Sequence, residues 1–294
     1  MATNGTAFLD ALYVHLHPYH GNPEIEVLSS DQITVRIAQM LERFRLDGEV
    51  AVITGGGNGI GRATAAAFVE AGAAVALLDC DEKAVKETET SLRAAGAEVE
   101  AYILDVTDEI TLETSFAGVN RRWGRLDILV NNAGISIRHP TVELSLADWN
   151  NVVAVNMTGV FLGSRAAARY MLPKRKGSIV NTASIMGLSG GGLYPNVSYQ
   201  ATKGGIVNMT RALAVEWARW GIRVNAVAPT WVKTQFISAL MTKPELMAQI
   251  ADVTPLGRLA EPDEVAAAIL FLASPAASMI TGHILAVDGG FLAQ

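Results

Sequence analysis

The sequence of 294 residues predicts an α/β fold in which helices cover both faces of one doubly wound parallel sheet. From residue 49 onward, short apolar segments alternate with longer helical patterns, as they do in a series of strand–helix–strand units. The short segments are apolar throughout, which is typical of strands that are buried on both faces. No proline- or serine-rich linker and no internal repeat interrupts this region, so we expect a single domain over residues 46–294.

Each expected element follows from its own residue pattern. Strands are predicted where aliphatic residues cluster in short runs, at 50–53, 74–78, 99–104, 128–130, 178–181, 224–228 and 284–287. Helices are predicted where apolar residues recur at three- and four-residue spacing, at 60–71, 82–95, 149–171 and 199–220.

Residues 1–45 depart from this pattern, and we expect them to form an appendage to the main domain. A helix is predicted from Asp31, with Ser30 or Asp31 able to cap its start. Its apolar residues form one stripe at helical spacing: Ile33, Ile37, Met40, Leu41 and Phe44. The histidines at 15, 17 and 20 could suggest a metal site. No nearby cysteine completes a ligand set, so we expect packing or surface roles and no metal centre.

Composition and charge exclude several functional classes. Half of the residues are hydrophobic and 18% are charged, which is enough apolar material for a large core. A net charge of −6 argues against a nucleic-acid partner. No apolar segment of 18 residues is present, and no positive charge precedes Arg36, so neither a membrane span nor a secretory signal is expected. The single cysteine, Cys80, suits a reducing compartment, and we expect a cytoplasmic protein.

A glycine-rich turn after the first expected strand predicts a nucleotide site. Residues 54–61 read Thr-Gly-Gly-Gly-Asn-Gly-Ile-Gly and are followed by a helix. Glycines allow the backbone to approach a pyrophosphate closely, and the helix N-terminus offers N–H groups and a partial positive charge. The spacing is T-G-x-x-x-G-x-G and not the G-x-G-x-x-G of many dinucleotide sites, and a merely flexible turn is the alternative.

Asp79 follows the second expected strand and suggests which dinucleotide is bound. Its carboxylate can accept hydrogen bonds from the adenine-ribose hydroxyls, and it would repel a 2′-phosphate. Cys80 and Asp81 supply no compensating cation, which favours NAD over NADP. Arg62 and Lys83 are the residues that could reverse this preference. Asp79 could instead cap the following helix.

Tyr199 and Lys203 form a pair with possible acid/base chemistry. Four residues apart on a helix, they share one face, so that the ammonium group can approach the phenol. A nearby cation favours the phenolate and lowers the tyrosine pKa from its usual value of about 10. A tyrosine and a lysine at this spacing also occur on ordinary solvated helix faces, so the pair needs support from the rest of the chain.

Several motifs in a fixed order provide that support, and in them the chain resembles the short-chain dehydrogenase/reductase superfamily over about residues 44–294. The matching positions are 54–61, Asp105-Val106, 131–134, Asn156, Ser184, Tyr199, Lys203 and 288–290. The resemblance implies a Rossmann-like fold, NAD(P)-dependent chemistry at CH–OH groups, and a homotetramer. Its subunit contacts would come from helices at 149–171 and 201–220 and from the C-terminal end. Phe271, Leu272 and Phe291 could be buried there or equally in the core of the monomer.

The resemblance also implies a role for each catalytic position. Tyr199 would exchange a proton with the substrate oxygen, and Lys203 would hold the nicotinamide ribose and lower the tyrosine pKa. Ser184 would position the substrate oxygen, and Asn156 would kink its helix and hold a relay water, or else simply satisfy the backbone. The implied cofactor-binding residues are Gly55, Asn58, Gly59, Ile60, Asp79, Asp105, Val106, Asn132, Ala133, Gly134, Tyr199, Lys203, Pro229, Val232 and Thr234.

Two departures from the family pattern concern the substrate side. Pro229 is followed by Thr230 and Trp231 where a glycine is usual, which removes conformational freedom and adds bulk near the nicotinamide. The interval from Ser184 to Tyr199 is slightly long and contains three glycines. We expect Tyr194 and Asn196 there to border the substrate, with a packing role for Tyr194 as the alternative.

The expected substrate pocket is polar. Its candidate residues are Ser136, Arg138, His139, Asn196, Trp231 and Gln235. The chain resembles the sugar and polyol dehydrogenases of the family, which implies a polyol, sugar or sugar acid as substrate. A 3-oxoacyl thioester reductase that uses NADPH is the first alternative, because it shares nearly every motif. A protein that binds NAD without catalysis is the second.

Overall fold

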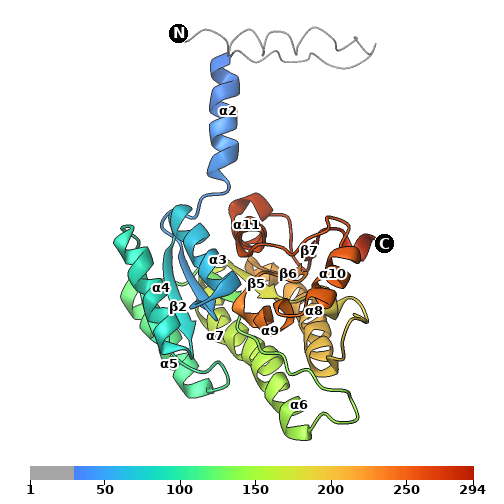
Figure 1. Cartoon of the computed structure of the whole chain (residues 1–294). Helices are drawn as coiled ribbons and strands as arrows, with labels where there is room; N and C mark the ends of the chain where they lie inside the picture. The colour runs from blue at the N-terminus through green and yellow to red at the C-terminus, as the bar shows by residue number, and fades with distance from the viewer. Residues whose placement is uncertain (1–29) are drawn as a thin grey trace. The chain divides into compact units, whose positions relative to one another are not determined.

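The computed structural model describes residues 30–294, which fall into two units that divide between Leu41 and Glu42. In the first unit, helix α2 (Ser30–Glu42) begins one residue before the predicted start at Asp31 (Figure 1). The caps proposed for this helix and the histidines at 15, 17 and 20 lie outside the residues whose side chains are described.

A parallel sheet of seven strands forms the centre of the second unit, in the order β3-β2-β1-β4-β5-β6-β7. The strands are β1 (Val50–Thr54), β2 (Ala74–Asp79), β3 (Val99–Ile103), β4 (Ile128–Asn131), β5 (Gly177–Thr182), β6 (Ile222–Pro229) and β7 (Ile284–Val287). Every predicted strand is confirmed to within two residues at each end. The winding direction reverses at β1, which pairs with β2 on one side and with β4 on the other.

Helices cover both faces of the sheet, as predicted (Figure 1). On one face lie α3 (Gly59–Glu70), α4 (Glu82–Ala94) and α11 (Pro262–Ala273), and on the other α5 (Glu109–Trp123), α7 (Gly159–Lys174) and α8 (Val197–Trp217). Strand β1 shows the reason for this arrangement. Ala51 and Ile53 pack into the first layer, whereas Val50 and Val52 pack into the second, which explains why these four successive side chains are all apolar.

The prediction of a single helix over residues 149–171 is wrong in one respect, because the structure divides this segment into three parts. Helix α6 (Leu146–Val153) is followed by a π-helical turn, η1 (Ala154–Thr158), and then by α7. The side chain of Asn156, inside this turn, is hydrogen-bonded to the distant backbone of Ile135. A π-turn inserts one extra residue into a helix and often marks a functional site.

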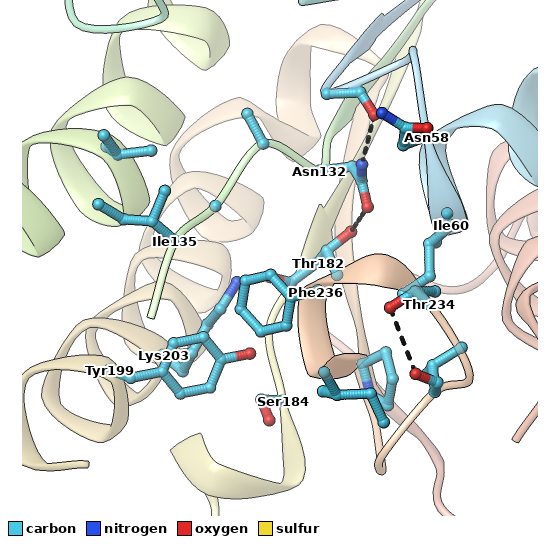
Figure 2. A pocket seen from close by; sticks show the side chains of 18 of the residues that line it. Asn58, Ile60, Asn132, Ile135, Thr182, Ser184, Tyr199, Lys203, Thr234 and Phe236 are labelled. Carbon is cyan, nitrogen blue, oxygen red and sulfur yellow. Dashed lines mark hydrogen bonds between the residues drawn. The ribbon is translucent and has the colours of Figure 1, made fainter. Parts of the chain in front are cut away.

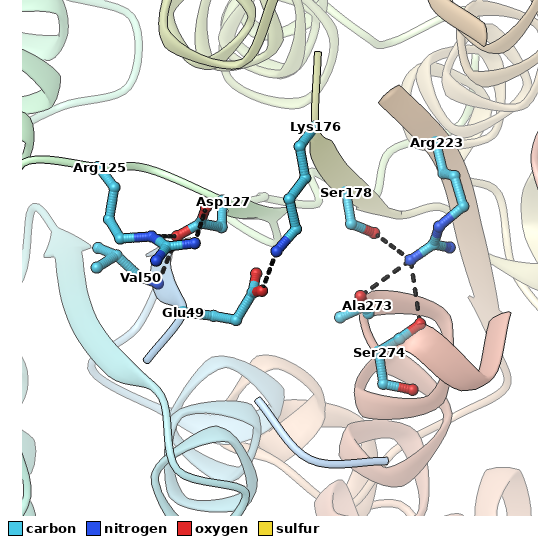
Figure 3. A network of polar contacts seen from close by, with 9 residues as sticks. All are labelled: Glu49, Val50, Arg125, Asp127, Lys176, Ser178, Arg223, Ala273 and Ser274. Atoms are coloured by element: carbon cyan, nitrogen blue, oxygen red, sulfur yellow. Dashed lines mark hydrogen bonds and ion pairs between the residues drawn. The ribbon is translucent and has the colours of Figure 1, made fainter. Parts of the chain in front are cut away.

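A network of ionic and polar contacts links residues at the amino ends of the strands (Figure 3). Asp127, only 3% exposed, accepts a hydrogen bond from the backbone N–H of Val50 at 2.9 Å and pairs with Arg125 at 2.6 Å. Lys176 pairs with Glu49 beside them. These contacts join the starts of β1, β4 and β5 at the edge of the sheet opposite the strands' carboxyl ends.

Beyond the carboxyl ends of the strands, a smaller apolar cluster forms a wall. It includes residues from β6 onward, namely Trp231, Ile237, Leu240 and Ile250, together with Ile185 and Met186. The short helices α9 (Ser238–Met241) and α10 (Pro244–Asp252) carry part of this cluster. Within residues 30–294, none of the helices combines the length and apolarity that crossing a bilayer requires.

Candidate active site

A cavity of about 750 Å³ opens at the carboxyl ends of the central strands. In open parallel sheets this edge, at the point where the winding reverses, is the usual place for a ligand. All fifteen positions predicted to bind the cofactor line this cavity. Ser184 lines it as well, but Asn156 does not. The fold therefore brings residues from between positions 55 and 234 together around one cavity.

The glycine-rich turn between β1 and α3 has the close packing that a pyrophosphate cradle needs. Gly55 and Gly59 have φ angles of +63° and +51°, which side chains rarely adopt. A Cβ on Gly61 would lie 2.0 Å from the carbonyl oxygen of Gly55, so the helix can approach the turn only without a side chain there. Because Asn58 makes no side-chain cap, the first N–H groups of α3 remain available to an anion at the cavity.

Asp79 lies at the end of β2, where its carboxylate is held by the backbone. Its Oδ2 accepts a hydrogen bond from Gly57 N at 2.9 Å, and its Oδ1 accepts one from Asp81 N at 3.0 Å. The alternative role of helix cap is wrong for Asp79, since Asp81 caps α4 by accepting from Ala84 N at 3.0 Å.

The surroundings of Asp79 contain no cation that lines the cavity. Arg62 is exposed and lies outside the lining, and Lys83 pairs with Glu87 at 3.9 Å. Burial raises the pKa of the Cys80 thiol, and the carboxylates of Asp79 and Asp105 raise it further. This end of the cavity is therefore acidic, which disfavours a second phosphate on the ribose.

The segment after β4 is tied to the glycine turn. The side chain of Asn132 donates hydrogen bonds to the carbonyl oxygens of Thr54 and Gly55, at 3.2 and 3.1 Å. In return, the hydroxyl of Thr54 accepts hydrogen bonds from the N–H groups of Asn132 and Ala133. These bonds join the carboxyl ends of β1 and β4 at the cavity.

Ser184, Tyr199 and Lys203 converge in the cavity from two elements (Figure 2). Tyr199 and Lys203 lie one turn apart on α8, with the lysine Nζ 5.4 Å from the centre of the phenol ring. That Nζ also donates a hydrogen bond to the carbonyl oxygen of Thr182, at 2.6 Å. Ser184 follows β5, and its Oγ accepts a hydrogen bond from Met186 N at 3.1 Å. The spacing expected from the sequence thus gives one cluster of hydroxyl, phenol and ammonium groups.

The predicted direction of the Tyr199 pKa shift is wrong for the protein without nucleotide. Desolvation raises the pKa of Tyr199 to about 12, and the hydroxyl of Ser184 only partly opposes this. Desolvation also lowers the pKa of Lys203 to about 8. Burial is the largest cause of the shift for Tyr199 and the sole cause for Lys203, because a low-dielectric site disfavours any charged form.

Asn156 lies behind the cavity wall and is fully buried. Its Oδ1 accepts a hydrogen bond from Ile135 N at 2.8 Å, and its Nδ2 donates to Ile135 O at 2.9 Å and to Thr202 Oγ1 at 3.2 Å. The amide therefore joins the loop after β4 to α8, next to the turn that carries Tyr199.

The two departures from the family pattern are accommodated. Among the described residues, only Arg175 combines a side chain with a positive φ, so Thr230 takes an ordinary backbone conformation. Trp231 is buried, with its ring edge-on to Phe291 at 5.6 Å and its Nε1 donating to the hydroxyl of Tyr194 at 2.7 Å. Tyr194 thus both packs and lines the cavity.

Four of the six expected substrate-pocket residues line the cavity: Arg138, Asn196, Trp231 and Gln235. Ser136 supports the wall through its hydrogen bonds with Asn196, and His139 is exposed outside it. Sequence reasoning missed Phe236, whose ring lies 6.0 Å from that of Tyr199, and Thr182, which holds Lys203. Phe236 follows Gln235 directly, but an isolated phenylalanine carries no chemical signal of its own. No group of residues in the described part of the chain could hold a metal ion.

A family profile described as enoyl-(acyl carrier protein) reductase matches residues 55–292. Galactitol 2-dehydrogenase (L-tagatose-forming) of Cereibacter sphaeroides is 45% identical over 84% of this chain and 96% of its own length. The chain belongs to the short-chain dehydrogenase/reductase family. It is accordingly an NAD(P)-dependent oxidoreductase that acts on CH–OH groups.

Two further similarities cover most of the chain. The 3-oxoacyl-[acyl-carrier-protein] reductase FabG of Thermotoga maritima is 39% identical over 85% of this chain and 100% of its own length. The crystal structure of a gluconate 5-dehydrogenase from Burkholderia cenocepacia, in complex with NADP and tartrate, superposes with a TM-score of 0.83. It is 35% identical and covers 86% of this chain and 99% of that one.

Proposed function

We propose that this enzyme oxidises the alcohol group of a small polyol, sugar or sugar acid with NAD, or carries out the reverse reduction. The observation that carries the proposal is the convergence of Ser184, Tyr199 and Lys203 in one cavity with the glycine turn of β1. When bound, the nicotinamide supplies the hydride chemistry. The protein positions the substrate and manages the proton.

We assign the proton transfer to Tyr199 and the orientation of the substrate oxygen to Ser184. In oxidation, the phenol oxygen takes the proton of the substrate hydroxyl, and in reduction it returns that proton to the carbonyl oxygen. The Ser184 hydroxyl holds that oxygen in position. We assign to Lys203, whose Nζ lies 5.4 Å from the centre of the Tyr199 ring, the binding of the nicotinamide ribose. Asn156 acts as a positioning residue through Ile135 and Thr202.

NAD is the cofactor that the acidic end of the cavity favours. Asp79 can accept the ribose hydroxyls while it remains bonded to the backbone, and no lining cation would balance a 2′-phosphate. NADP occurs in the gluconate 5-dehydrogenase structure, so the preference needs a direct measurement. We expect NADH to bind at least tenfold more tightly than NADPH, and a tighter NADPH complex would overturn the assignment.

The substrate assignment depends on the polar lining and on the relatives. Asn196 and Gln235 can hydrogen-bond hydroxyl groups, and relatives named for galactitol, threitol and gluconate match most of the chain. The similarity to the Thermotoga maritima reductase keeps a 3-oxoacyl thioester reductase as the second candidate. Asp79 argues against it where that activity depends on NADPH.

A substrate panel tests the reaction and its catalytic residue together. In the oxidative direction, the wild-type enzyme is assayed with NAD on polyols and sugar acids. In the reductive direction, it is assayed with NADH on keto-sugars and on an acetoacetyl thioester. NADH absorbance is followed in both. We expect turnover on the first groups and a loss of about 10²–10⁴-fold in kcat for Tyr199→Phe, with NADH binding retained. Turnover confined to the thioester would select the second candidate. A wild-type rate equal to that of Tyr199→Phe, with NAD still bound, would indicate a protein that binds NAD without catalysis.

We also propose a cytoplasmic homotetramer in which residues 46–294 form the catalytic domain and residues 1–45 an appendage. The free, exposed Cys80 supports a reducing compartment. Cell fractionation tests the location.

A further inference from the structure

Arg138 is a cation in the cavity that has no hydrogen-bond or ion-pair partner among the described residues. It lies in the loop after β4, and its side chain lines the cavity with Tyr194 and Tyr199. The Nε atom is buried and makes no hydrogen bond, and none of the ion pairs formed within residues 30–294 involves Arg138. A buried polar group without a partner is costly, so such a group in a binding cavity points to a ligand.

Aromatic rings hold the guanidinium group in place. Its central carbon lies 5.4 Å from the ring centre of Tyr194 and 5.9 Å from that of Phe236. The Phe236 ring is in turn 6.0 Å from the ring of Tyr199. The guanidinium carbon and the centre of the Tyr199 ring are thus less than 12 Å apart, since 5.9 and 6.0 Å together set the upper limit. One small molecule can therefore reach both groups.

The charges of the cavity are separated along the sheet. Its acidic lining residues lie at or just after the carboxyl ends of β2 and β3, on one side of β1: Asp79, Asp81 and Asp105. Arg138 follows β4, on the other side, where no carboxylate lines the cavity. The only other lining cation, Lys203, already donates to the carbonyl oxygen of Thr182. The part of the cavity near Tyr199 therefore offers one free positive charge to a ligand.

We propose that Arg138 binds a carboxylate of the substrate, so that the enzyme acts on hydroxy acids in preference to neutral polyols. This inference rests on the proposed function, since it selects among substrates of the same site. Guanidinium presents a planar fork of N–H donors that matches the two oxygens of a carboxylate. The aromatic rings restrict its rotation, which reduces the entropy lost when the substrate binds.

Paired substrates that differ only at one terminal carbon test the proposal. Gluconate is compared with glucitol, and galactonate with galactitol, in the wild-type enzyme and in Arg138→Gln. We expect kcat/KM for each acid to exceed that for its neutral partner by about ten- to a hundredfold in the wild type. In the variant this preference disappears, because the acid loses its contact while the polyol loses none. A matched control, Arg121→Gln, removes an exposed positive charge from α5 and should keep the preference.

The ratio of kcat/KM for the acid to kcat/KM for the polyol distinguishes a direct contact with Arg138 from a general effect of the Arg138 charge. Arg138 also lowers the Tyr199 pKa slightly, and that effect is lost equally for both substrates. The proposal is overturned if the wild type shows no preference for the acids, or if Arg138→Gln slows both members of a pair by the same factor.

A binding measurement keeps the inference testable if no turnover is found and the proposed function fails. The affinities of gluconate and glucitol for the protein saturated with NADH are measured by calorimetry, where no hydride transfer can occur. We expect tighter binding of gluconate to the wild type and equal binding of the two compounds to Arg138→Gln. Equal affinities in the wild type would contradict the assignment directly. Thermal unfolding of the variant confirms that it is folded.

Discussion

At the scale of a single residue, Lys203 shows that burying a charged group in the active site lowers the stability of the fold. Its side chain is only 3% exposed, and it donates a hydrogen bond to the carbonyl oxygen of Thr182. Desolvation lowers its pKa from 10.5 to about 8, so the folded protein holds the charged form less firmly than the unfolded chain does. Stability is thus given up for a charge that the proposed reaction needs.

We predict that Lys203→Met is more stable than the wild type at pH 7 but inactive. The shift from 10.5 to about 8 corresponds to on the order of 3 kcal/mol against the charged ammonium group at neutral pH. Part of this gain is offset because the carbonyl oxygen of Thr182 loses its donor. We expect a net increase of roughly 1–2 kcal/mol in the free energy of unfolding, measured by urea denaturation at a fixed protein concentration.

The pH dependence of this difference has a defined sign. Below pH 8 both the folded and the unfolded wild type carry the charge, and the full cost is present. Between pH 8 and 10.5 the folded protein releases its proton first, so the wild type gains stability relative to the variant. The control, Lys83→Met, removes a lysine whose side chain is 86% exposed and should show no such convergence. A difference that stays constant from pH 7 to 10 would contradict the assignment.

At the scale of the elements, the local features of this fold could be predicted from the sequence. The strands are short aliphatic runs, and the turn between β1 and α3 is marked by its glycines, so each depends on neighbouring residues only. The division of the predicted helix at Ala154 depends instead on Asn156, whose partner Ile135 is 21 residues away. Likewise, the burial that raises the Tyr199 pKa depends on packing between distant segments, which the spacing of Tyr199 and Lys203 cannot report.

Helix α11 illustrates how a single side chain can secure an element. Arg223, on β6, donates hydrogen bonds to the carbonyl oxygens of Ala273 and Ser274, at 2.9 and 3.2 Å (Figure 3). It also donates to the carbonyl oxygen of Leu272, at 2.7 Å. The last carbonyl groups of a helix lack intrahelical partners and carry partial negative charge, so a cation there satisfies both needs. Arg223 also donates to the hydroxyl of Ser178 on β5.

We predict that Arg223→Met lowers the free energy of unfolding by about 2–3 kcal/mol, because several buried carbonyl groups lose a charged donor. Urea denaturation measures the loss. Arg169→Met is a suitable control, since Arg169 forms an exposed pair with Glu113 at 2.7 Å and should change stability by less than about 1 kcal/mol. Michaelis constants of both variants should match the wild type, because these residues do not line the cavity. A loss no greater in Arg223→Met than in the control would show that this cap contributes little.

At the scale of the whole molecule, the parallel sheet places the residues that line the cavity and the ionic network that stabilises the fold at opposite edges. Since all strands run in one direction, every strand end that lines the cavity lies at one edge, and the ionic network of Asp127 lies at the other. The polar residues at the carboxyl edge can therefore differ among relatives without disturbing the network. This arrangement explains why the fold and the reaction class can be inferred together, whereas the substrate depends on loop residues such as Arg138.

The tetramer expected for this family must use surface that the monomer leaves exposed. Leu272 is fully buried in the core and Phe291 packs on Trp231, so these C-terminal residues already have partners within the chain. Phe161 on α7 and Val215 on α8 are instead 44% and 82% exposed. Both lie on the helices from which we expect the subunit contacts, and both are therefore candidates for burial in an interface.

We predict a particle of about 125 kDa by light scattering at micromolar concentration, four times the chain mass of 31.2 kDa. The double variant Phe161→Glu, Val215→Glu should dissociate into smaller species, since a buried pair of unpartnered carboxylates is strongly unfavourable. Val142→Glu, in an exposed loop where the residue is 94% accessible, should leave the particle intact. A wild-type mass near that of one chain would exclude the tetramer. A tetramer that survives the double variant would instead place the subunit contacts away from these two positions, for example at the free edge of β7, which pairs only with β6 among the described strands.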